Sequence, residues 1–141
     1  MDKITVSIAT MKEREKALQE TINSLIKQCD KINVFLHYYE EIPDFLKHEK
    51  IEVAMDKHYG DKGDADKFFW SNRIKGYHFT CDDDLIYPKD YVEKMIERIE
   101  KYKRKCVLTA HGQFFTKLPI TDYFGNGGRK TYRCLGNVDK D

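Results

Sequence analysis

Residues 77–84, YHFTCDDD, join a short strand-like segment to three consecutive aspartates, and this stretch decides how the rest of the sequence is interpreted. Residues 77–81 indicate a strand, and the acidic triplet follows its carboxyl end. Pro88 then precedes a helix, since Val92, Met95, Ile96 and Ile99 recur at helical spacing. A strand that ends in charge and leads into a helix is typical of α/β proteins.

The same alternation of strand and helix runs along the chain on both sides of this stretch. Residues 4–10, ITVSIAT, predict a first strand, because β-branched apolar residues alternate with Thr and Ser. Further strands are expected at 32–38, 51–55 and 106–110, and helices at 13–28, 43–48 and 65–73. Five strands separated by helices predict an α/β fold, a mostly parallel, doubly wound sheet with helices on both faces.

Length and composition exclude several classes of protein. The chain has 141 residues, close to one domain, and its 25 basic and 24 acidic residues give a net charge of +1, which argues against nucleic-acid binding by bulk charge. An aromatic content of 13% argues against a disordered tail. No apolar stretch is long enough for a transmembrane span or a secretory signal, and four cysteines without a CxxC pair suggest reduced thiols. We therefore expect a cytoplasmic protein.

The acidic triplet is the strongest chemical signal. In an extended segment alternate residues face the same side, so Asp82 and Asp84 are expected to converge while Asp83 points away. Two carboxylates at one rim suit Mg²⁺ or Mn²⁺, which accept hard oxygen ligands. The alternative is a solvated acidic turn before the next helix.

A second signal lies in the segment GDADK, residues 63–67. Asp64 can cap a helix that begins at Ala65, and Lys67, one turn further on, can reach a ligand as a mobile point charge. The alternative is an ordinary helix start with a solvated lysine. Asp61, Asp64 and Asp66 hint at a calcium loop, but the EF-hand spacing is absent.

The expected topology brings several of these residues to one place. In open parallel sheets, ligands bind beyond the carboxyl ends of the strands, where the strand order reverses. Arg14, His37, Tyr38 and the acidic triplet are thus predicted to share one rim, although a lone arginine in a first helical turn is usually solvated. The histidines show no metal-ligand spacing, so His37, His58, His78 and His111 are interpreted as structural.

Taken together, these motifs resemble the nucleotide-sugar-binding half of GT-A fold glycosyltransferases, close to family 2, over residues 4–112. The features that carry the resemblance are the first strand, Arg14, the GDADK segment, and a strand that ends in a DxD motif followed by a proline and a helix.

The resemblance implies roles for particular residues. Thr10 and Arg14 would lie near the nucleotide, and Asp64 and Lys67 would reach the nucleoside and diphosphate. Asp82 and Asp84 would hold Mn²⁺ or Mg²⁺, with Asp83 among the contacts to the nucleotide-sugar. The implied reaction moves a sugar from a nucleotide-sugar donor, UDP-linked by resemblance, to a hydroxyl of a saccharide or other acceptor. No residue is assigned as the catalytic base.

Three departures from the family pattern shape the remaining expectations. His37 and Tyr38 stand before Glu40 and Glu41, where family members often place an acidic residue that reads the base. Residues 1–112 would form the nucleotide-sugar-binding core, and residues 113–141 a loop-rich, partial acceptor-side segment. Because the chain ends at Asp141, it is expected to be truncated, to be completed by a second chain, as in a homo-oligomer, or to be a non-catalytic nucleotide-sugar-binding module.

Two other enzyme classes fit less well. A phosphatase of the haloacid-dehalogenase type also uses an Asp-x-Asp pair, but that fold places the pair after the first strand, whereas here it follows the fourth. Enzymes that synthesise sugar-nucleotides on a similar fold need a glycine-rich phosphate loop after the first strand, and residues 11–14, MKER, contain no glycine.

Overall fold

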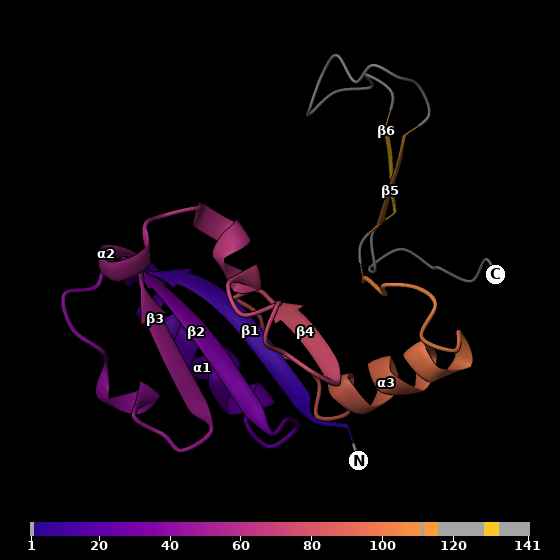
Figure 1. The fold of residues 1–141 in the computed structure, drawn as a ribbon, viewed down its shortest axis with the longest axis horizontal. Helices are drawn as coiled ribbons and strands as arrows, with labels where there is room; N and C mark the ends of the chain where they lie inside the picture. The colour runs from indigo at the N-terminus through magenta and orange to yellow at the C-terminus, as the bar shows by residue number, and fades with distance from the viewer. Residues whose placement is uncertain (1, 111, 116–128, 133–141) are drawn as a thin grey trace. The chain divides into compact units, whose positions relative to one another are not determined.

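The computed structural model describes residues 2–110, 112–115 and 129–132, and the chain divides into two units, residues 1–97 and 98–141. The first unit contains a parallel sheet made of β1 (Ile4–Met11), β2 (Lys31–His37), β3 (Ile51–Met55) and β4 (Tyr77–Cys81). Their order is β3-β2-β1-β4, so β1 lies inside the sheet (Figure 1). All three pairings are parallel.

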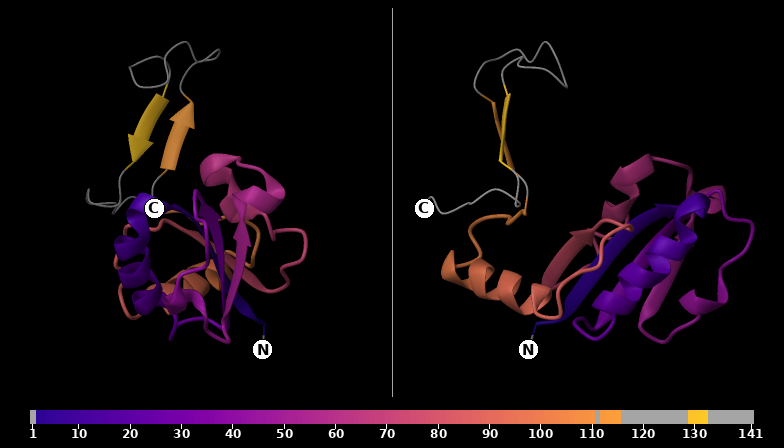
Figure 2. Two further views of the ribbon diagram at one scale, coloured as in Figure 1. Left: turned by 90° about the vertical axis from the view of Figure 1, so that its left-hand side faces the viewer. Right: turned by 180° about the vertical axis from the view of Figure 1, so that it is seen from behind.

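One face of the sheet carries the larger core. The 3₁₀ turn η1 (Lys12–Arg14) leads from β1 into helix α1 (Glu15–Leu25), which lies against this face (Figure 2). Its apolar side buries Leu18, Ile22 and Leu25. Helix α3 (Tyr91–Lys101) adds Val92 to the same core. The alternate residues of the strands that point to this face complete it, among them Val6, Ile8, Ile32, Val34, Leu36, Phe79 and Cys81.

The opposite face is covered by the segment between β3 and β4. Helix α2 (Asp56–Tyr59) follows β3 directly, and the 3₁₀ helix η3 (Gly63–Phe68) then lies against β1 and β2 (Figure 2). Trp70 packs with Phe35 and Ala54 in a second, smaller core. A further 3₁₀ turn, η2 (Asp44–Leu46), lies between β2 and β3. The predicted α/β fold with a parallel sheet is therefore confirmed.

The prediction for residues 106–110 is wrong. No strand forms there, and Val107 is 95% exposed, so this short apolar run has no sheet to join in the described part of the chain. The second unit instead contains an antiparallel pair, β5 (Gly112–Phe115) and β6 (Arg129–Tyr132). β6 lies in the segment 113–141, which was expected to be loop-rich, and residues 116–128 and 133–141 of that segment lie outside the described residues.

No helix in the described ranges is long enough and apolar enough to cross a bilayer.

Gly76 fixes the entry into β4, and its replacement tests the pairing of β4 with β1. Its φ is +93°, and an added Cβ would lie 2.4 Å from the carbonyl oxygen of Lys3. We predict that Gly76→Ala lowers the free energy of unfolding by about 3 kcal/mol, since strain and a backbone clash combine. Gly60→Ala is the control: its φ is +82° but nothing lies within 4 Å, so a loss of about 1 kcal/mol is expected. Equal losses in urea unfolding would contradict this account.

The cysteines test the larger core by their reactivity. Burial raises the pKa of the Cys29 thiol to about 11 and that of Cys81 to about 12, whereas Cys106 is exposed. At pH 8 in the folded protein, iodoacetamide is therefore expected to modify Cys106 and to spare Cys29 and Cys81 until denaturant is added. Mass spectrometry of the peptides measures this, and rapid alkylation of Cys81 in the native state would contradict the placement of β4.

Candidate functional site

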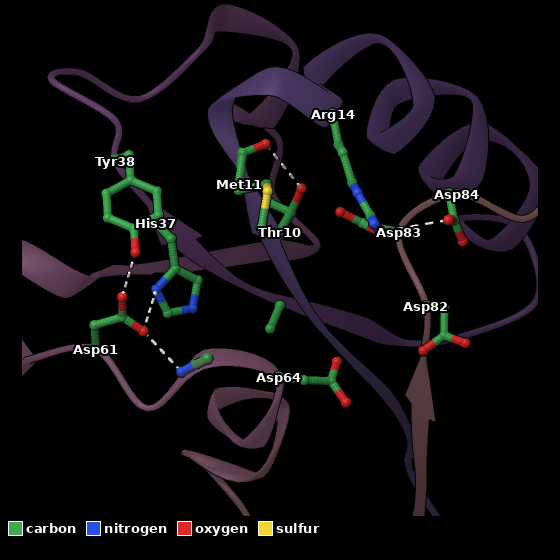
Figure 3. Close-up of a pocket in the computed structure, with 12 residues that line it drawn as sticks. Thr10, Met11, Arg14, His37, Tyr38, Asp61, Asp64, Asp82, Asp83 and Asp84 are labelled. Atoms are coloured by element: carbon green, nitrogen blue, oxygen red, sulfur yellow. Dashed lines mark hydrogen bonds and ion pairs between the residues drawn. The ribbon is translucent and has the colours of Figure 1, made fainter. Parts of the chain in front are cut away.

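A cleft of about 410 Å³ lies at the carboxyl edge of the parallel sheet (Figure 3). From β1 the strand order runs to β2 and β3 on one side, while β4 lies on the other side, so the order reverses between β1 and β4. This reversal is where open parallel sheets bind ligands. The cleft is lined from the ends of β1, β2 and β4, from Arg14 and from the start of η3, by Ala9, Thr10, Met11, Arg14, His37, Tyr38, Asp61, Gly63, Asp64, Asp82, Asp83 and Asp84.

Arg14 is tied to the acidic triplet across the cleft. Its Nη1 donates to Oδ1 of Asp83 at 2.9 Å and to Oδ2 of Asp84 at 3.3 Å. The Asp83 side chain is 5% exposed and that of Asp84 50%, so the first contact is the shielded one. The hydrogen bond to Asp83 raises the pKa of Arg14 further, and nearby charges act in the same direction. Arg14 is thus a fixed cation at the cleft, although half of its side chain is exposed.

Lys67 forms a second fixed cation. Its Nζ lies 2.8 Å from Oδ1 of Asp64 and 2.9 Å from Oδ1 of Asp82. Burial tends to lower the pKa of Lys67, but hydrogen bonds and charge from these two carboxylates outweigh it, and the net shift is upward. The residue is only 7% exposed. The expectation of a mobile point charge is therefore wrong: the ammonium group is held in place.

The acidic segment is anchored to helix α1 behind it. The backbone N–H of Asp82 donates to the hydroxyl of Tyr87 at 2.9 Å, and the Tyr87 N–H donates to Oγ of Ser24 at 3.1 Å. The hydroxyl of Thr21, which is fully buried, donates to the carbonyl of Leu85 at 2.8 Å. These hydrogen bonds hold the backbone of residues 82–87 against helix α1, although the side chains of Leu85 and Ile86 are exposed.

The orientation predicted for the triplet differs from the one observed. Strand β4 ends at Cys81 and the chain bends at residues 83 and 84, so strand alternation does not extend into the motif. Asp83, which was expected to point away, is the buried member and reaches Arg14 (Figure 3). Asp82 and Asp84 contact different cations, Lys67 and Arg14, and remain 60% and 50% exposed.

The start of η3 also differs from its prediction. The helix begins at Gly63 rather than Ala65, and its N-terminal residue has no side-chain cap. Asp64 contacts Lys67 and is 82% exposed. The backbone N–H groups in this turn are instead bound by neighbouring acids: Asp61 accepts from Gly63 at 2.7 Å, and Asp66 accepts from Lys62 at 2.8 Å.

The structure nevertheless brings together the residues that the sequence singled out. Six of the predicted site residues line one cleft, and Lys67 bonds two of them; the six are Thr10, Arg14, Asp64, Asp82, Asp83 and Asp84. Among the described residues, five carboxylates of the cleft face two fixed cations, Arg14 and Lys67. Even a charged His37 would leave the acids in excess, so the cleft favours a cation or a cation-bound anion.

Sequence reasoning placed His37 at the rim and Asp66 in a possible calcium loop, but it did not bring the two together. His37 was interpreted as structural, yet it lies at the end of β2 with its ring between Asp61 and Asp66. These three are the one described group of three or more His, Cys, Asp or Glu residues whose donor atoms all lie within 4.8 Å of one another. The position of His37 in the sequence could have indicated this site, because His37 ends a strand at the predicted rim.

No known protein family matches the chain, and no curated protein matches it.

The two contacts of Arg14 are expected to differ in energy. Asp83→Asn leaves the guanidinium without its shielded partner, and we predict a loss of about 2 kcal/mol in the free energy of unfolding, a value reduced because Arg14 is half exposed. Asp84→Asn removes an exposed contact and should cost no more than about 0.5 kcal/mol. Urea unfolding of both variants measures the difference, and equal effects would show that Asp83 does not anchor Arg14.

Proposed function

We propose that this chain binds a nucleotide-sugar together with Mn²⁺ or Mg²⁺ and transfers the sugar to an acceptor hydroxyl. The observation that carries the proposal is the acidic cleft at the strand reversal between β1 and β4, in which exposed carboxylates stand beside fixed cations. The resemblance of the sequence to GT-A glycosyltransferases supports the same function and favours a UDP-linked donor.

Charge explains why a metal is part of the proposal. A diphosphate entering this cleft would meet five carboxylates and two fixed cations, so it would be repelled unless a further positive charge came with it. Asp82 and Asp84 suit that cation, because their side chains are 60% and 50% exposed. Lys67 and Arg14 each contact one oxygen of these carboxylates, and a carboxylate has lone pairs for further ligands.

Asp83, Arg14 and Lys67 would then position the metal ligands and contact the phosphates. Asp83 holds Arg14 by its Nη1, and the other N–H groups of a guanidinium can meet phosphate oxygens. Lys67 holds Asp82 from the buried side and so fixes one carboxylate of the pair. When bound, the cation would offset the charge that develops on the departing diphosphate.

Binding is tested by calorimetric titration of UDP into the protein with Mn²⁺ and, separately, with EDTA. We expect binding with Mn²⁺ and none without it. Asp82→Asn and Asp84→Asn should each weaken binding at least about tenfold while circular dichroism stays unchanged. Asp44→Asn is the matched control, since Asp44 is 93% exposed and is not among the cleft residues.

Equal affinity for UDP in EDTA, or in the Asp82 and Asp84 variants, would overturn the role given to the metal.

Transfer is tested separately from binding. Incubation with a UDP-sugar, Mn²⁺ and a panel of saccharide acceptors should release UDP, and the release should depend on the acceptor. Binding without any release would contradict the transferase assignment and favour the alternative, a non-catalytic nucleotide-sugar-binding module.

A further inference from the structure

A second group of side chains that can bind a metal lies on the other side of the cleft from Arg14 and the acidic triplet. His37, at the end of β2, has its Nδ1 3.2 Å from Oδ1 of Asp61 and its Nε2 3.6 Å from Oδ2 of Asp66. Figure 3 shows the imidazole ring beside Asp61, away from Arg14 and Asp82. Donor atoms from all three residues lie within 4.8 Å of one another.

The histidine itself points to a ligand. His37 is only 5% exposed, and neither of its ring nitrogens has a partner in hydrogen-bonding geometry, although carboxylate oxygens lie nearby. Its ring is held on one side by Phe35, with 5.1 Å between the ring centroids. Buried polar groups are nearly always satisfied, so an imidazole with two unpartnered nitrogens needs an explanation.

The two carboxylates are already oriented toward this ring. Asp61 accepts the hydroxyl of Tyr38 at 2.7 Å and the backbone N–H of Gly63 at 2.7 Å. Asp66 is 3% exposed and accepts the backbone N–H of Lys62 at 2.8 Å. Hydrogen bonds of this kind position the ligands of metal sites.

The negative charge around the His37 ring favours binding of a divalent cation over protonation of the ring alone. Asp56 adds a third carboxylate, with Oδ2 4.0 Å from Nδ1 of His37. A protonated imidazole would offset one of these three negative charges, whereas a divalent cation offsets two. Asp61 is 39% exposed and lines the cleft, so the group can be reached from the cleft at this residue.

We propose that His37, Asp61 and Asp66 bind a divalent transition-metal cation of the Zn²⁺ type, at a site separate from Asp82 and Asp84. The donor set distinguishes the two sites. One imidazole nitrogen with carboxylate oxygens suits Zn²⁺ better than Mg²⁺, whereas the all-oxygen pair of Asp82 and Asp84 suits Mg²⁺ or Mn²⁺. The inference does not depend on the proposed glycosyltransferase activity.

The test is a titration of the full chain with Zn²⁺ alone, followed by calorimetry and by NMR of the histidine ring nitrogens. Cys106 and Cys134 are replaced by Ser to remove competing thiols. We expect a saturable event in which one ring nitrogen of His37 changes its signal to that of a metal-bound nitrogen. Mg²⁺ at the same concentration should leave the ring unchanged.

Variants then locate the site. His37→Gln and Asp61→Asn should each weaken this Zn²⁺ event at least about tenfold. Asp44→Asn and Asp84→Asn should leave it intact, which separates this site from the one in the proposed function. Circular dichroism confirms folding, and Asp61→Asn serves if the buried His37→Gln does not fold.

Three results would overturn the inference: no Zn²⁺ binding by the folded protein, binding that leaves the His37 ring signals unchanged, or binding that is lost in Asp84→Asn and kept in His37→Gln. A His37 ring that keeps both N–H protons throughout the titration would identify a histidine clamped by carboxylates instead.

Discussion

β1 pairs in parallel with β2 on one side and with β4 on the other. The pairing with β2 extends further along β1 than the pairing with β4. The β2 ladder continues to Met11 and His37, while the β4 ladder ends at Ile8 and Cys81. The end of β1 therefore borders the cleft on the β4 side, and the acidic triplet bends beside it. This arrangement places Arg14, which follows β1, beside Asp83, which follows β4.

Charge in the cleft is arranged by burial. Asp83 and Lys67 are buried and hold the exposed groups around them: Asp83 holds Arg14, and Lys67 holds Asp64 and Asp82. Asp82 and Asp84 therefore keep exposed side chains while Lys67 and Arg14 each contact one of their oxygens. Such preorganisation lowers the cost of ordering side chains when a ligand binds. It also explains how an acidic triplet can be tolerated at one strand end, since each carboxylate has a cationic partner.

The sequence was sufficient for the strands of the sheet and for the shared rim, because alternation along β1 and the parallel topology are local or nearly local signals. It failed where the outcome depended on tertiary contacts. Val107 lies in a run with strand-like composition but has no sheet to pair with in the described structure. The inward turn of Asp83 depends on Arg14, which is distant in sequence, and the bend at the end of β4 breaks the alternation. The environment of His37 could not be predicted either, since Asp61 and Asp66 reach it only through the tertiary packing of the segment between β3 and β4.

The central claim is that this acidic cleft accepts a diphosphate only through a divalent cation held by the acidic triplet. A crystal structure with UDP and Mn²⁺, with data collected for the anomalous signal of manganese, tests it most directly. The account predicts an anomalous peak in contact with a carboxylate of Asp82 or Asp84 and with the diphosphate. A nucleotide bound elsewhere on the protein, or bound in this cleft with no manganese beside those carboxylates, would contradict it.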